Sequence, residues 1–411
     1  MALLWKFHGT SPLSTVSPLM YHGRTMAERE IYLDNAATTK PHPAVVEAMT
    51  RALTQEFGNP SSLHHKGLAA ERLVKDAREA VARTLDVAPE EIVFTSGGTE
   101  SNTLAIRGVA RLSKGRHIVT TAIEHSSVLT PIRRLAEEGY EVTELPVDGE
   151  GRVSPDRLAQ ALRADTILAS VMAVNNELGT VQPLEAIGRV IRSHAAGGRP
   201  VYFHVDAVQA WGKIPLRPKA WGVDLMSISG HKVHGPKGAG ALYVRKGVRL
   251  APLLGGGDQE GGIRPGTENV PGIAGLGAAA SLLGADLSDV AGRMTDLRDR
   301  LRRAIAAIPE VRINTPDRGA APHILNASFP GVRGETLLHR LEMDGIYTST
   351  GSACHSHDPK PSHVLLAIGL PPDLCTSSLR FSLNRFTTSD EIDAAAAVVA
   401  RAVADLRTLV R

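Results

Sequence analysis

The chain has 411 residues, of which 43% are apolar, and its formal net charge is +3. Acidic and basic residues are interspersed and nearly balanced, which argues against a nucleic acid or an anionic membrane as the binding partner. The two cysteines, Cys354 and Cys375, are too few for a secreted disulfide framework and favour a reducing, cytoplasmic setting. No apolar run approaches the roughly 20 residues that a membrane span needs.

The first 30 residues differ from the rest of the chain, with Ser, Thr, His and Pro but no long apolar segment. A secretory signal is therefore not expected. We interpret residues 1–30 as a leader that is disordered or loosely packed. An organellar transit peptide, an appended tag and an upstream start, with Met26 as the alternative first residue, remain open.

From about residue 31, short apolar runs alternate with glycine-rich turns and helical patterns. Such an alternation predicts an α/β fold with a mostly parallel sheet covered by helices on both faces. The expected strands are 92–95, 117–120, 166–174, 201–205, 225–228 and 241–244, and helices are expected at 69–85 and 184–194. Ligands of such sheets bind beyond the carboxyl ends of the strands, so polar residues there are the candidates for function.

A glycine-rich loop, 255–266, follows the last of these strands, and a long helical stretch is expected from about 273 to 307. Strands near 324–329 and 379–383 and a final Ala-rich helix then predict a smaller α+β domain. The predicted division is a large domain, 42–286, and a small domain made of 31–41 together with 287–411.

Two candidate functional residues end neighbouring strands. Lys232 closes the run that begins at Asp224, and Asp206 ends the strand at 202–206. Pyridoxal phosphate needs a lysine to hold its aldehyde as a Schiff base and an acid to keep its ring nitrogen protonated. An amine and a carboxylate in these places therefore predict a site for pyridoxal 5'-phosphate.

The segment 94–102 combines a strand, a glycine turn and a helix start. Free N–H groups at a helix N-terminus bind phosphate, and the glycines let the anion approach closely. A simple capped turn is the alternative interpretation. With Ser229 and His231 expected nearby, the sequence favours a phosphate site.

Four further polar residues have both a functional and an ordinary interpretation. His125 could stack on a pyridine ring and move protons, although a lone histidine is more often structural. Gln209 would face the cofactor's phenolic oxygen if a helix begins after Asp206. Asn176 could bond that oxygen or the substrate, although paired asparagines commonly form turns. Arg380 would clamp a substrate carboxylate or be an exposed arginine at a sheet edge.

Cys354 lies in a small, polar, proline-containing segment that is typical of a mobile loop. Such a loop is a poor place to bury a thiol, and the neighbouring His355 and His357 would favour the nucleophilic thiolate. A metal site is disfavoured because these ligands are crowded into four residues with no second cluster. Cys375 lacks such surroundings and is expected to be structural.

Taken in order, the motifs resemble those of the cysteine desulfurases of the NifS/IscS type. These belong to the class V aminotransferase group of fold-type I pyridoxal phosphate enzymes. The likeness runs from about Tyr32 to the C-terminal helix; each motif is weak alone, but all of them in order are highly specific. The matching segments are 32–39, 58–64, 95–102, 124–125, 175–179, 206–209, 229–232, 264–269 and 351–354.

The resemblance implies a role for each of these residues. Lys232 would hold the cofactor and move the α-proton, and Cys354 would take the sulfur as a persulfide. His125 would stack on the ring, and Arg380 would bind the substrate carboxylate. The implied cofactor-binding set is Gly98, Thr99, His125, Asn176, Asp206, Gln209, Ser229, His231, Lys232 and Thr267, with Asn176 also at the substrate and Thr267 at the phosphate of the other subunit of a homodimer.

The activity that the resemblance implies is conversion of L-cysteine to L-alanine, with transfer of sulfur to Cys354 and on to an acceptor protein. Iron–sulfur cluster assembly and RNA or DNA thiolation are the expected destinations. The run Cys354-His355-Ser356 also resembles selenocysteine lyases, which makes selenocysteine an alternative substrate. A plain class V aminotransferase or lyase and a non-catalytic cofactor-binding scaffold are further alternatives, although intact Lys232 and Cys354 argue against the scaffold.

Overall fold

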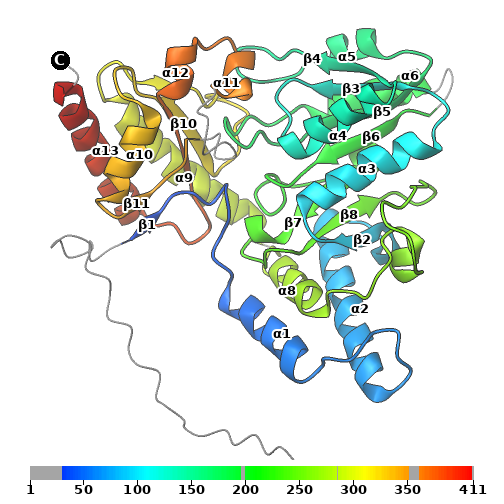
Figure 1. Cartoon of the computed structure of the whole chain (residues 1–411). Coiled ribbons are helices and arrows are strands. Elements are labelled where there is room, and N and C mark those ends of the chain that lie inside the picture. Colours follow the sequence, from blue (N-terminus) through cyan, green and yellow to red (C-terminus); the bar gives the residue numbers. More distant parts are fainter. Residues whose placement is uncertain (1–29, 196–199, 285, 351–360, 410–411) are drawn as a thin grey trace, which may run out of the picture.

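The computed structural model describes residues 30–195, 200–284, 286–350 and 361–409. It has a large seven-stranded sheet and, beside it, a smaller region built around a three-stranded sheet (Figure 1). The predicted α/β class is confirmed. The predicted leader, apart from Glu30, and Cys354 lie outside the described residues.

The strands of the large sheet run in the order β2-β8-β7-β6-β5-β3-β4. β8 is antiparallel to both of its neighbours, and the remaining pairs are parallel. Their bounds are β2 Ile92–Thr95, β3 His117–Thr121, β4 Glu141–Leu145, β5 Thr166–Met172, β6 Tyr202–Asp206, β7 Leu225–Ser229 and β8 Gly240–Val244. β4 was not among the expected strands, because its residues include two exposed glutamates and form no apolar run.

Successive side chains of a strand point to opposite faces of the sheet, and here they pack into two different hydrophobic cores. Leu225 packs with helices α3 (Gly98–Leu112) and α4 (Ser126–Glu137) on one face of the sheet. Its neighbour Met226 packs with α2 (His65–Leu85), α6 (Leu184–Ala195) and α8 (Val270–Ser281) on the other. Smaller elements complete this region: α1 (Pro43–Thr54), α5 (Pro155–Ala161), α7 (Pro218–Trp221) and the 3-10 turns Pro89–Glu91 and Gln259–Gly262.

In the smaller region, β10 (Ile324–Ser328) pairs antiparallel with both β12 (Ser378–Ser382) and β9 (Arg312–Ile313). Ile31 and Leu33 share its hydrophobic core with residues of the C-terminal helix, although they stand at opposite ends of the sequence. The predicted domain boundaries stay a prediction. The other elements are β1 (Ile31–Tyr32), β11 (Ile346–Tyr347), α9 (Leu287–Ala306), α10 (Gly334–Glu342), α11 (His363–Ala367), α12 (Pro372–Thr376) and α13 (Ser389–Leu409).

The single long helical stretch expected from about 273 to 307 is wrong. The structure has two helices, α8 and α9, and the chain turns between Ser281 and Leu287. Gly284 lies in this turn. Glycine destabilises a helix interior, because ordering its backbone costs more conformational entropy than for other residues. Within the described residues, no helix is both long and apolar enough to span a bilayer.

Candidate active site

A cavity of about 320 Å³ lies at the carboxyl ends of β5, β6 and β7. This is the expected position, since ligands of parallel sheets bind beyond the carboxyl ends of the strands. Of the predicted site residues, those that line it are Gly98, Thr99, His125, Asn176, Asp206, Gln209, Ser229, His231, Lys232 and Arg380.

One end of the cavity has the donors that an anion requires. The turn before α3 passes through Gly97 at φ 148°, and a Cβ on Gly98 would lie 2.6 Å from Val208 Cγ2. Gly98 and Thr99, the first residues of α3, line this end of the cavity, and the N–H groups of a helix N-terminus attract negative charge. Ser229 ends β7 beside this turn, and burial lowers the pKa of the neighbouring His231 to about 4, so its ring is neutral.

Asp206, at the end of β6, is only 5% exposed. Asn102 Nδ2 donates to its Oδ2 at 2.8 Å, and the backbone N–H of Val208 donates to its Oδ1 at 3.0 Å. These two donors fix the direction in which the carboxylate faces the cavity. Asn102 was not among the predicted site residues; its position one turn into α3, after the predicted phosphate-binding turn, was the available signal.

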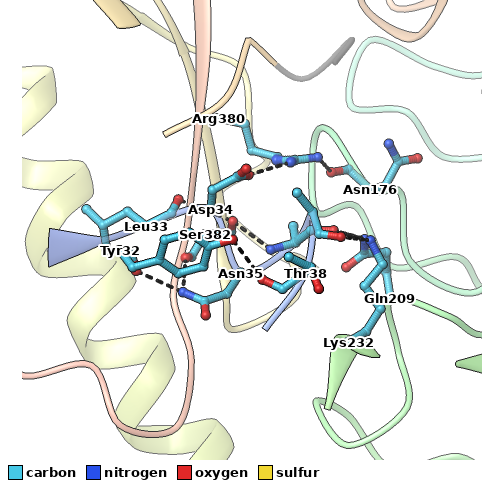
Figure 2. Close-up of polar contacts among 12 residues, drawn as sticks. Tyr32, Leu33, Asp34, Asn35, Thr38, Asn176, Gln209, Lys232, Arg380 and Ser382 are labelled. Carbon is cyan, nitrogen blue, oxygen red and sulfur yellow. Dashed lines mark hydrogen bonds and ion pairs between the residues drawn. The ribbon is translucent and has the colours of Figure 1, made fainter. Parts of the chain in front are cut away.

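Lys232 ends a short 3-10 turn, Gly230–Lys232, directly after β7. Its Nζ donates to the carbonyl of Ala37 at 2.8 Å and to the carbonyl of Ala36, both in the segment that follows β1 (Figure 2). The carbonyl of Lys232 accepts a hydrogen bond from buried Lys213 at 3.1 Å. The amine is thus held at the cavity wall by a segment that lies far away in the sequence.

His125 precedes α4 and is half-buried. Its Nδ1 accepts the backbone N–H of Ser127 at 3.1 Å, which leaves the proton of a neutral ring on Nε2. Burial lowers the pKa of His125, an effect that nearby Asp206 opposes and Lys232 reinforces. A neutral imidazole at the cavity wall can pack on a flat ring.

Arg380 is 3% exposed, so the alternative of an exposed edge arginine is wrong. Its guanidinium donates to the carbonyl of Asn176 at 2.8 Å and to Asp34 Oδ1 at 2.9 Å (Figure 2). Its Nε is buried and has no acceptor among the described residues. A buried cation with a spare donor, facing a cavity, suits a carboxylate ligand.

Gln209 reaches the cavity by a route that differs from the expected one. Residues 208–213 form turns and not a helix, so Gln209 lines the cavity from a turn that follows β6. Thr267 lies on an exposed stretch before α8 and is not part of the cavity wall of its own chain.

Cys354 lies outside the described residues, but the residues that flank its segment are placed beside the cavity. The backbones of Ser349 and Arg380 bond each other, with the N–H of Arg380 at 2.7 Å from the carbonyl of Ser349. Ser362 donates from its hydroxyl to buried Glu177, the neighbour of Asn176, at 2.6 Å. Ser349 therefore contacts a residue of the cavity wall, and Ser362 contacts the neighbour of one.

The other cysteine, Cys375, is buried in α12, where burial raises the pKa of its thiol to about 11. It therefore stays protonated and non-nucleophilic at neutral pH. This agrees with the structural role expected from the sequence.

The residues around the cavity fit pyridoxal phosphate. Anion-binding residues lie at the start of α3, and two hydrogen-bond donors orient the carboxylate of Asp206. The amine of Lys232 lies at the cavity wall, and the buried Arg380 has an N–H without an acceptor among the described residues. The chain matches the aminotransferase class-V family model over residues 31–395, and it belongs to that family. Enzymes of this family use pyridoxal phosphate.

Relatives within the family narrow the assignment. The chain is 46% identical to a cysteine desulfurase IscS of Dictyoglomus turgidum, over 93% of this chain and 96% of that protein. A solved NifS-like protein superposes with a TM-score of 0.86 at 38% identity, covering 92% of this chain and all of that one. A structure titled SspA in complex with cysteine gives a TM-score of 0.76 at 37% identity, covering 87% of this chain and 99% of that one.

Proposed function

We propose that this chain is a pyridoxal phosphate-dependent cysteine desulfurase. It converts L-cysteine to L-alanine and passes the sulfur through Cys354 to an acceptor protein, for iron–sulfur cluster assembly or RNA or DNA thiolation. The observation that carries the proposal is the single cavity that unites Lys232, Asp206, His125 and Arg380. The relatives named cysteine desulfurase and the solved relative that holds cysteine support the choice of substrate. The low cysteine content supports a cytoplasmic setting.

Each side chain has a task that its surroundings suit. Bound pyridoxal phosphate supplies an aldehyde for an amine and a ring that withdraws electrons from the substrate's α-carbon. Arg380 binds the substrate carboxylate, and Asn176, whose carbonyl accepts from Arg380, lies beside it. Asp206 faces the ring nitrogen, His125 packs on the ring, and Lys232 takes the α-proton. Gly98, Thr99, Ser229 and His231 hold the phosphate, and Gln209 bonds the phenolic oxygen.

The sulfur step needs a thiolate. The Cys354 thiolate attacks the sulfur of the substrate, the carbon–sulfur bond breaks, and the sulfur stays on Cys354 as a persulfide. The electron pair of the broken bond remains with the carbon, which ends as the methyl group of alanine after protonation. Cysteine and the enzyme thiol thus become alanine and an enzyme persulfide, with no outside oxidant.

The two cysteines give a matched test of this step. Cys354→Ala should abolish alanine formation from cysteine and leave cofactor binding intact. Cys375→Ala should retain activity, because its thiol is buried and protonated. Mass spectrometry of the enzyme after one turnover should find an added sulfur on Cys354 alone. Full alanine formation by Cys354→Ala would instead indicate a plain class V aminotransferase or lyase.

We further propose a homodimer in which Thr267 binds the phosphate in the partner's site. The exposure of Thr267 and its place outside the cavity of its own chain support this. Lys232→Ala and Thr267→Ala chains should each have low activity alone. Mixing them should restore one site per mixed dimer, since that site draws Lys232 from one chain and Thr267 from the other. No restoration in dimers verified by light scattering would contradict the trans arrangement.

A further inference from the structure

A histidine that belongs to the smaller region reaches the residue proposed to bond the cofactor's phenolic oxygen. His323 immediately precedes β10 and is 0% exposed. Its Nε2 lies 3.3 Å from Oε1 of Gln209, which lines the cavity at the end of the large sheet. His323 was not among the residues that the sequence predicts for the site.

The surroundings of His323 decide where its proton lies. Burial holds the pKa of His323 well below its ordinary value, and four nearby cations, on Lys213, Arg380, Lys232 and Arg298, push in the same direction. The ring is therefore neutral and has a single N–H. Because an amide oxygen can only accept, that N–H must be on Nε2. Nδ1 is buried and has no partner in the described part of the chain.

This hydrogen bond and a second one, from the Gln209 nitrogen, together determine which way the Gln209 amide points. Its oxygen is occupied by His323, and its nitrogen donates to the carbonyl of Ala36 at 2.8 Å (Figure 2). An amide nitrogen has two hydrogens, so one donor remains at the cavity wall. With the amide reversed, its oxygen would face two acceptors, the Ala36 carbonyl and any ionised oxygen in the cavity.

We propose that His323 is a positioning residue that holds the Gln209 amide with its N–H side toward the cavity. In that orientation Gln209 donates to the phenolic oxygen of bound pyridoxal phosphate. The inference depends on the proposed function only for the identity of the cofactor. A donor to an ionised oxygen favours the ionised form, so His323 tunes the proton equilibrium of the bound cofactor through Gln209.

The test compares His323→Phe, which keeps a ring but has no N–H, with His323→Gln, which keeps a donor. Apo protein is titrated with pyridoxal 5'-phosphate by tryptophan fluorescence, and the visible absorption of the loaded enzyme is titrated with pH. His323→Phe should bind the cofactor about tenfold more weakly and raise the pH midpoint by about one unit. His323→Gln should stay near wild type in both. If His323→Phe does not fold, His323→Leu takes its place.

A second comparison separates positioning from general packing. In a Gln209→Ala background, His323→Phe should shift the pH midpoint no further, because His323 acts through Gln209. Additive shifts, or His323→Gln behaving like His323→Phe, would overturn the proposal. If the wild-type enzyme binds the cofactor but forms no alanine from cysteine, the proposed function is contradicted. The inference about His323 is not affected by that result.

Discussion

The large and the small sheet contribute to the same cavity in different ways. The large sheet supplies Asp206, Ser229 and Lys232 from the ends of two adjacent strands, within a short stretch of sequence. The small sheet supplies Arg380 from the middle of β12, and His323, just before β10, contacts the cavity residue Gln209. Neither of these is near the others in sequence.

This difference separates the residues that hold the cofactor from the arginine that binds the substrate. Residues at strand ends are fixed by the parallel sheet, which suits a cofactor that stays in place. Arg380 is oriented by contacts with Asp34 and Asn176, which come from distant segments (Figure 2). Changes at Asp206, Ser229 and Lys232 should therefore alter cofactor binding, and a change at Arg380 should alter the handling of the amino acid. His323 belongs to the smaller region but acts on the cofactor, because its hydrogen bond is to Gln209 at the end of the large sheet.

The largest effect is expected for Lys232→Ala. Loss of the amine should reduce alanine formation by about a thousandfold or more and abolish the visible absorption of the loaded enzyme. Exposed Lys237, close in sequence, provides the control, and Lys237→Ala should keep both properties. A Lys232→Ala enzyme that retains the visible band would assign the amine to another lysine.

Arg380→Met should act on the substrate and spare the cofactor. Removing a charged donor to a carboxylate should lower kcat/KM for cysteine on the order of a hundredfold, chiefly through KM. The cofactor absorption should remain. Steady-state kinetics measure the change in kcat/KM, and an absorption spectrum of the same preparation measures the bound cofactor. Loss of cofactor by this variant would contradict the assignment of Arg380 to substrate binding.

Glu124 gives a pH-dependent prediction for the large sheet. Burial raises the pKa of Glu124 from 4.5 to about 8, against hydrogen bonds from Thr121 and the N–H of Met172. The folded chain thus keeps a proton that the unfolded chain releases. The stabilisation is complete below about pH 4.5 and is lost as the pH rises through about 8.

Glu124→Gln has nothing to deprotonate. Relative to wild type, it should therefore gain stability as the pH rises from 6 to 9, by roughly a few kcal/mol at most. Thermal unfolding across this range measures the difference, and Glu137→Gln on the exposed face of α4 is the control. A pH-independent difference between Glu124→Gln and wild type would contradict the assigned protonation.

The smallest effect is expected for Ser362→Ala. The Ser362 hydroxyl accepts the N–H groups of Val364 and Leu365 at the start of α11 and donates to buried Glu177. Its loss should cost about 1–2 kcal/mol of stability and raise KM for cysteine less than tenfold. Ser154→Ala removes a comparable cap from α5, away from the cavity, and should leave KM unchanged. Equal KM values for the two variants would show that Ser362 serves folding alone.

Most of the large-sheet site could be predicted from the sequence. Buried strands appear as apolar runs, and the residues that end them must meet at one edge of a parallel sheet. This located Asp206, Ser229 and Lys232. The turn at Gln209 and the break between α8 and α9 were missed, because the helix-like composition of both stretches gives little local signal for where a helix stops.

The sequence by itself determined the cofactor class and the α/β layering, because both depend on local order: an amine, an acid and a glycine turn, each at the end of a strand or just after it. Only the tertiary structure decided that Arg380 is buried and that the Ala36 carbonyl accepts hydrogen bonds from both Gln209 and Lys232. It also decided that His323 lies within hydrogen-bond distance of Gln209. These contacts join segments that lie far apart in the chain, and they form only when the two hydrophobic regions pack together. No local pattern can specify a hydrogen bond whose partners are brought together by packing.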